Sequence, residues 1–148
     1  MSKTKLSEKK LQKLMELQKK QFKEVQKAFV VRESAELVKN IVNKTPVDTG
    51  RLRAAWHEKP IEKEGNSFIV SCSNNVEYAE FVEYGHRYVS GGGRFKKLED
   101  FDPETDTAGF VAGKFMARDG LKETQEGSQK RWDEHFNKWK AKFDKVMK

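Results

Sequence analysis

The feature that most constrains this chain is a long segment that contains no helix-breaking residue. Between Ser7 and Asn43 the sequence has neither glycine nor proline. One set of positions there recurs at alternating spacings of four and three, which align them on one side of a helix. These positions are Leu11, Met15, Gln18, Phe22, Val25 and Phe29. The apolar side is wider in the second half, from Val30 to Val42. The pattern predicts a long helix whose more polar first half projects and whose second half packs on the body.

The ends of this helix also have sequence signals. Ser7 is a plausible N-cap, because its hydroxyl oxygen can accept a hydrogen bond from the first helical turn. Pro46 pushes the residue before it out of the helical backbone region, so we expect the helix to stop at residues 44–46. Residues 1–44 therefore form the first of three regions.

A second long helix is predicted at the C-terminal end, from about Gly113 to Met147. Its stripe also recurs at spacings of three and four. The stripe contains Ala117, Leu121, Thr124, Ser128, Trp132, Phe136, Trp139, Phe143 and Val146. Small residues line its first half, which we expect to pack on the sheet, and large aromatic residues line its second half. Such a helix would be roughly 50 Å long, so part of it should overhang, against the N-terminal helix. The stripe has two interpretations, protein core or subunit interface.

The middle region, residues 45–112, is predicted to contain strands and loops. Two extended runs, Arg51–Ile61 and Asn66–Ser73, indicate a β-hairpin. A short helix follows and ends at Gly85, with glutamates three residues apart that indicate a solvated face. Residues 86–112 form a connection of more than twenty residues, either mobile or ordered only on a partner. The prediction is a single α+β domain over residues 1–148, in which the two long helices pack on a small antiparallel sheet.

The positive charge of the chain is concentrated in its first region. The formal net charge is +7, and residues 1–44 contain twelve Lys/Arg against five Asp/Glu, whereas the remainder balances to zero. Such a segment either attracts an anionic surface or is a solvated helix face. Basic residues there and after the triple glycine at 91–93 are the candidate interaction residues. They are Lys9, Lys10, Lys13, Lys19, Lys20, Arg94, Lys96 and Lys97.

We find no sequence pattern that indicates catalysis, a metal or a cofactor. His57, His86 and His135 are far apart in the sequence, and none has a partner at metal-ligand spacing. The single cysteine, Cys72, excludes an intramolecular disulfide framework and lies in an alternating strand, which favours a buried apolar role. No signal peptide or membrane-spanning stretch is expected. The sequence therefore predicts a protein that is not an enzyme and has no cofactor.

Three short motifs, in this order, resemble those of a bacteriophage family. Residues 45–53 are similar to the signature T-P-V-D-T-G-x-L-R, residues 78–85 to Y-A-x-x-x-E-x-G, and residues 114–121 resemble P-F-L-x-P-A-L with substitutions. The family is the phage tail-component family typified by the gene-ten product of HK-ninety-seven-type siphophages. The matching positions are Thr45, Pro46, Val47, Asp48, Thr49, Gly50, Arg51, Leu52, Tyr78, Ala79, Glu83, Gly85, Phe115 and Met116.

The resemblance implies a structural virion protein, either a tail-completion or a head-to-tail joining subunit. Its copies would form a ring at the neck, in contact with the adaptor or stopper and with the tail terminator. It would be assembled in the host cytoplasm, would meet DNA only as DNA passes through the channel, and would not contact a membrane. Two alternatives stay open: another minor tail component, or a non-specific DNA-binding module that uses the basic N-terminal helix. Whether the isolated chain is a monomer also stays open.

Overall fold

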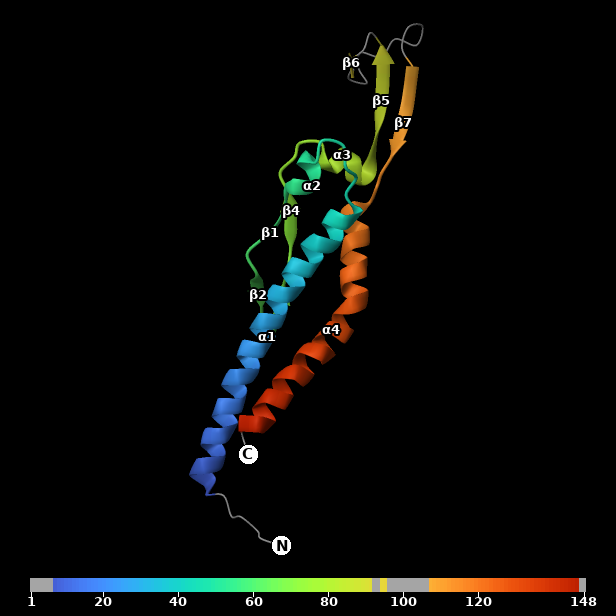
Figure 1. Ribbon diagram of the computed structural model, residues 1–148. Coiled ribbons are helices and arrows are strands. Elements are labelled where there is room, and N and C mark those ends of the chain that lie inside the picture. The colour runs from blue at the N-terminus through green and yellow to red at the C-terminus, as the bar shows by residue number, and fades with distance from the viewer. Residues whose placement is uncertain (1–6, 92–93, 96–106, 147–148) are drawn as a thin grey trace.

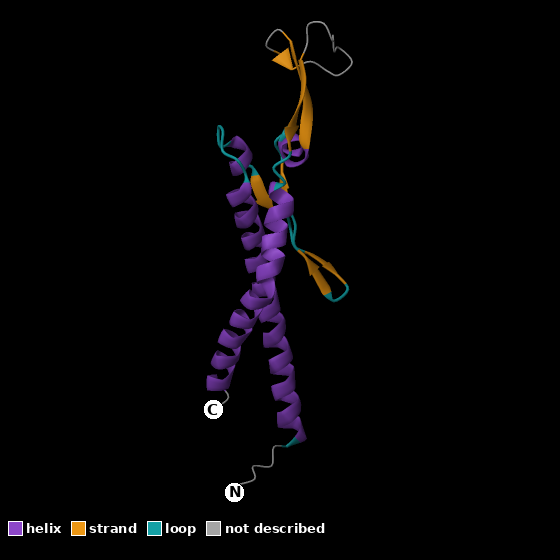
Figure 2. Ribbon diagram, turned by 90° about the vertical axis from the view of Figure 1, so that its right-hand side faces the viewer, coloured by secondary structure: helices purple, strands orange, loops and turns teal. Residues whose placement is uncertain are grey.

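Two long helices dominate the molecule. The computed structural model describes residues 7–91, 94–95 and 107–146, and gives side chains throughout except at 87–91, 94–95, 107–108 and 146. Helix α1 spans Glu8–Lys44 and helix α4 spans Met116–Val146. They lie side by side (Figures 1 and 2), and Figure 2 shows that they diverge toward the end where both chain termini are found. The predicted α+β class and both predicted long helices are confirmed.

Helix α1 has the predicted bounds. Ser7 occupies the N-cap position with an extended backbone, although its side chain makes no capping hydrogen bond. At the other end Thr45 is already extended, with a ψ of 124°, and Pro46 follows it. This is the conformation that a proline imposes on the residue before it.

Helix α4 packs along α1, and the two halves of this contact differ in chemistry. In the half near Met116, Gly120 lies against Ile41, so a Cβ atom added to Gly120 would be 2.8 Å from the Cα atom of Ile41. The small residues of α4 therefore allow close approach to α1, and the expected packing on the sheet is wrong for this position. In the other half, aromatic rings of both helices meet edge-to-face, with Phe29 and Trp132 centroids 5.0 Å apart. The predicted overhang of α4 against the N-terminal helix is confirmed.

The predicted hairpin is present, but it begins later than expected. Its strands are β1 (Trp56–Glu58), β2 (Glu62–Glu64), β3 (Ser67–Ile69) and β4 (Cys72–Asn74). The inner pair β2–β3 and the outer pair β1–β4 are antiparallel ladders of one long hairpin. Residues Arg51–Ala54, expected to be extended, form the short helix α2. Gly50 at its N-cap has a φ of +81°, which turns the chain and lets the Gly50 carbonyl accept a bond from the Ala54 N–H.

A second sheet projects beyond the end of the helix pair (Figure 1). Helix α3 (Ala79–Tyr84) ends at Gly85, where the φ of +81° redirects the chain into β5 (Gly85–Gly91). Strand β5 pairs antiparallel with β7 (Thr107–Ala112) and with the short β6 (Arg94–Phe95). The expectation of an irregular connection over residues 86–112 is therefore wrong for its two flanks. Local composition could not reveal this ladder, because its partners are separated in the sequence. Residues 92–93 and 96–106 lie outside the described part.

The buried core is small for a chain of 148 residues. Among the described residues, five hydrophobic side chains are buried. They are Leu37, Ile41, Leu52, Val76 and Met116. Among the same described residues, thirteen large hydrophobic side chains are at least 36% exposed. Much of the surface of this elongated molecule is therefore available for contacts.

Candidate functional site

The three motif segments meet where α1 ends and α4 begins. Leu52 of the first motif and Met116 of the third pack with Val76 in one buried cluster, and their exposed fractions are 6%, 0% and 7%. Partly buried side chains of the second motif region, Ala79 and Val82, pack against this cluster. The three motifs thus form one structural unit although they are far apart in the sequence.

Thr45 fixes the end of α1 within this unit. Its side chain is 3% exposed. The hydroxyl donates a hydrogen bond to the Ile41 carbonyl at 2.8 Å and accepts one from the Trp56 indole N–H at 2.9 Å. This buried hydroxyl stabilises the fold through two hydrogen bonds, one as donor and one as acceptor. Its removal would also leave the indole N–H of Trp56 without a hydrogen-bond partner, which costs additional free energy. The threonine therefore ties the last turn of α1 to strand β1.

Glu83 connects the second motif to the third. Its carboxylate is buried and accepts hydrogen bonds from the backbone N–H groups of Ala117 (2.9 Å) and Arg118 (3.1 Å). These N–H groups belong to the first turn of α4, where they have no partner within the helix, and the helix dipole favours a negative charge there. The expectation of a solvated glutamate face is correct for Glu77 and Glu80 but wrong for Glu83. The motif distinguishes Glu83 from the other two glutamates, because its pattern specifies a glutamate only at this position.

The other half of the motif unit faces solvent. Val47 is 62% exposed and Tyr78 36% exposed, and the neighbouring Phe81 and Tyr84 of α3 are 55% and 65% exposed. Val47 and Tyr78 also line a shallow groove of about 210 Å³. The groove is lined by Pro46, Val47, Asp48, Thr49, Gly50, Leu52, Tyr78 and Val82. We call Val47, Tyr78, Phe81 and Tyr84 the exposed apolar ridge. The motif positions include neither Phe81 nor Tyr84, so the sequence did not mark either residue as a candidate.

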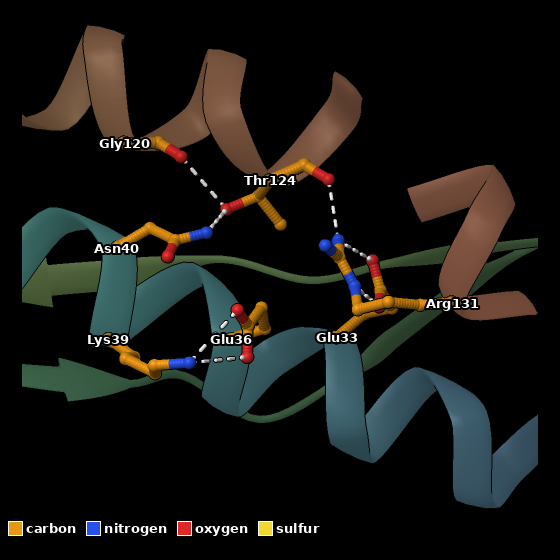
Figure 3. Close-up of polar contacts among 7 residues, drawn as sticks. All are labelled: Glu33, Glu36, Lys39, Asn40, Gly120, Thr124 and Arg131. Carbon is orange, nitrogen blue, oxygen red and sulfur yellow. Dashed lines mark hydrogen bonds and ion pairs between the residues drawn. The ribbon is translucent and has the colours of Figure 1, made fainter. Parts of the chain in front are cut away.

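Near the motif unit, a polar network joins α1 to α4 (Figure 3). Arg131 makes two hydrogen bonds to the Glu33 carboxylate, at 2.6 and 2.8 Å, and a third to the Thr124 carbonyl. The hydroxyl of Thr124 donates to the Gly120 carbonyl and accepts from the Asn40 amide at 3.0 Å. The hydrogen bonds to Glu33 raise the pKa of the Arg131 guanidinium above its ordinary value. This network fixes the register of the two helices. Its partners are far apart in the sequence, so no local pattern predicts it.

The candidate interaction lysines do not belong to the motif unit. The five on α1 are exposed along its first half, near the chain ends. The side chain of Arg94 and the residues Lys96 and Lys97 lie outside the described part. Four exposed lysines of α4 lie at the same end of the helix pair. The net charge of residues 45–148 is zero, so the count by region did not reveal them. They are Lys138, Lys140, Lys142 and Lys145.

Groups with chemical reactivity are dispersed. The Nε2 atom of His57 lies 2.8 Å from the Ser73 hydroxyl across the β1–β4 ladder, but both atoms belong to an exposed contact. The described residues include no cluster of three or more His, Cys, Asp and Glu that could hold a metal ion. Burial raises the pKa of the Cys72 thiol, and the charge of Lys59 opposes this shift. A basic neighbour is therefore present in space, although none was visible in the sequence.

The described part of the chain thus defines an α+β protein whose motif residues build a structural junction and an exposed ridge. Residues 8–85 match the family described as "Bacteriophage HK97-gp10, putative tail-component", and the chain belongs to this family. The match includes the first two motifs, while the third lies beyond it and packs against them. No curated protein and no solved structure matches the chain. Over the described residues, no helix combines the length and hydropathy needed to cross a membrane.

Proposed function

We propose that this protein is a tail-completion or head-to-tail joining subunit whose copies form a ring at the neck of the virion. The observation that carries the proposal is the exposed apolar ridge, because it is built on the motif unit of a tail-component family. Large apolar side chains that stay exposed on one short helix and on the loop beside it favour a protein interface. The buried half of the unit would then act as the rigid support of the ridge, and no catalysis is required of it.

The projecting sheet supports a role in assembly. Strand β7 has β5 on one side and no strand on its other side within the described residues. An edge strand offers backbone donors and acceptors to a neighbouring chain, and native proteins usually protect such edges. Phe110 of β7 is 64% exposed and adds an apolar contact at this edge. In a ring, one face of each copy meets a different face of the next copy, so the ridge and the edge strand need not contact themselves.

The expected partners follow from this position. Copies of the chain would contact one another, and the ring would contact the adaptor or stopper on the head side and the tail terminator on the tail side. Assembly would take place in the host cytoplasm. DNA would meet the protein only as it passes through the channel, without a sequence-specific contact. The protein would need no cofactor.

A phage that lacks the gene tests the proposal. We expect electron microscopy to show filled heads and complete tails that remain separate, and purified protein should restore infectivity in proportion to the amount added. Rescue by a Phe81→Ala/Tyr84→Ala variant should fail, whereas Val31→Ala, which truncates an equally exposed side chain on α1, should rescue. Joined, infectious virions in the absence of the protein would contradict the proposal. Tails of abnormal length, or no tails, would identify another minor tail component instead.

A further inference from the structure

Residues of α1 and α4 line a groove with an apolar floor. The groove lies in the half of the helix pair where Figure 2 shows the two helices diverging. Its volume is about 550 Å³. Val25 and Ala28 of α1 and Trp139 and Phe143 of α4 form the floor. The remaining lining residues are Gln21, Glu24, His135, Lys138 and Lys142. The aromatic rings here are only partly covered by the other helix, so the seam is incomplete in the isolated chain.

The apolar floor continues along α1 toward the start of the helix. Leu14, Leu17, Gln21 and Ala28 are separated by spacings of three, four and seven, which place them on one face of a helix. Because Gln21 and Ala28 line the groove, Leu14 and Leu17 extend its floor. Leu17 is 43% exposed. An apolar strip that begins between two helices and continues along one of them can be covered by an amphipathic helix.

The charges around the groove select the kind of helix. Lys138 and Lys142 line the α4 wall, whereas Glu24 lines the α1 wall. The surroundings are basic: residues 7–31 contain seven lysines and three glutamates, and residues 135–145 contain four lysines and one aspartate. A second copy that presented this same end would meet like charge, which is unfavourable. Duplex DNA would satisfy the lysines but has no apolar face to cover Trp139 and Phe143.

We propose that this groove binds an acidic amphipathic helix of another virion protein. The apolar face of that helix covers Val25, Ala28, Trp139 and Phe143, and its acidic edge lies along Lys138 and Lys142. The inference rests on membership of the tail-component family and does not require a position at the neck. The contact completes the seam between α1 and α4 as a three-helix arrangement.

Two synthetic helical peptides test the proposal on the full-length protein. One has leucine at heptad positions a and d and glutamate at e and g, and the other has lysine in place of every glutamate. Fluorescence anisotropy should show that the acidic peptide binds at least about tenfold more tightly than the basic one. The contribution of the acidic edge should decrease with added salt, because the groove lysines are exposed.

Variants with matched charge changes separate the groove from the general positive charge. The Lys138→Glu/Lys142→Glu variant should weaken binding of the acidic peptide at least about tenfold. The control is Lys19→Glu/Lys23→Glu, which removes the same charge from exposed α1 positions on the side of the helix away from the groove, and it should change binding less than about threefold. Ala28→Trp fills the groove without a charge change at an exposed position and should also weaken binding.

Three results would overturn the proposal. The first is equal affinity for both peptides or for both charge variants. The second is tight, steeply salt-dependent binding of a duplex DNA that is lost in the Lys19→Glu/Lys23→Glu control, which would assign the basic end to phosphate contacts. The third is self-association of the protein that Ala28→Trp abolishes, which would assign the groove to a second copy. None of these results bears on the neck assignment, because that is decided by the particles made without the gene.

Discussion

The contact between α1 and α4 uses two different chemistries in its two halves. Near the motif unit, Gly120 lies against Ile41, and the buried Glu33–Arg131 pair and the Asn40–Thr124 hydrogen bond join the helices. Toward the chain ends, the contact consists of aromatic rings that remain partly exposed and of grooves on the surface. The same two helices are therefore held by close backbone approach at one end and by loosely covered rings at the other.

This difference indicates which half must be rigid. Buried hydrogen bonds require one geometry, so the half that supports the motif unit has a fixed register. Stacked and edge-to-face rings tolerate small shifts, and a partner can cover their exposed faces. We therefore expect mutations near the motif unit to unfold the protein, and mutations near the chain ends to affect binding more than stability.

The largest expected effect is that of Glu33→Ala. The side chains of Glu33 and Arg131 are 9% and 15% exposed, so removal of the carboxylate leaves a guanidinium without its partner in a mostly buried place. A broken buried pair costs about 3 kcal/mol in the free energy of unfolding. Urea denaturation followed by circular dichroism measures this loss. Glu126→Ala is the control, because Glu126 is exposed and pairs with the exposed Lys122 within α4, and it should have little effect. Equal losses in the two variants would contradict the special role of the buried pair.

Gly120→Ala comes second. The added methyl group would overlap the backbone of Ile41 and force the helices apart, and we expect a loss of about 2 kcal/mol. The comparison variant is Lys130→Ala, which shortens an exposed side chain on the same helix. Its effect should be within about 0.5 kcal/mol, as is usual for a surface substitution. If thermal unfolding gave the reverse order, close approach at Gly120 would not be what holds this half together.

Trp139→Ala probes the other half of the helix pair. Trp139 contacts Phe22, Phe136 and Phe143 but is only half-buried, so we expect about 1 to 2 kcal/mol, less than a fully buried aromatic residue would lose. The same variant should lose most of its binding to the acidic helical peptide. A loss of stability as large as that of Glu33→Ala would mean that the aromatic half is ordinary core.

Much of the fold could be predicted from periodicity and from backbone-restricting residues. The bounds of α1 followed from a segment without glycine or proline and from Pro46, and α4 followed from its stripe. The β5–β7 ladder could not be predicted, because its pairing joins segments on either side of a long connection. Helix α2 was missed because a single turn after Gly50 has no periodicity of its own.

The candidate site was predictable in its residues but not in its geometry. The motif resemblance singled out Thr45, Glu83 and Met116. The spacing of the glutamates, however, predicted that Glu83 faces solvent. Its burial depends on where α4 begins, more than thirty residues later, and that is a tertiary property. The Glu33–Arg131 pair is similar, because the two residues are 98 positions apart and nothing local marks either as a partner.

The smallest expected effect concerns the contact between α1 and α4 in the half near the motif unit. It tests whether this contact is stable because its polar pairs are buried or only because they are polar. Lys44 at the end of α1 bonds to Glu123 of α4 at 2.7 Å, and this hydrogen bond raises the pKa of Lys44 above the ordinary lysine value of 10.5. Because the pKa is higher in the folded than in the unfolded chain, the pair stabilises the fold fully below pH 10.5 and loses this contribution as the pH rises through the folded value. Both side chains are exposed to solvent, so Lys44→Ala should lower the urea midpoint only slightly at neutral pH.

The difference in urea midpoint between this variant and the unmodified protein should shrink with added salt and disappear in strongly alkaline buffer. Lys39→Ala, whose pair does not bridge the helices, controls for helix propensity. If Lys44→Ala destabilised the protein as much as Glu33→Ala does, any polar bridge between α1 and α4 would suffice, and the distinction between a buried and an exposed pair would fail.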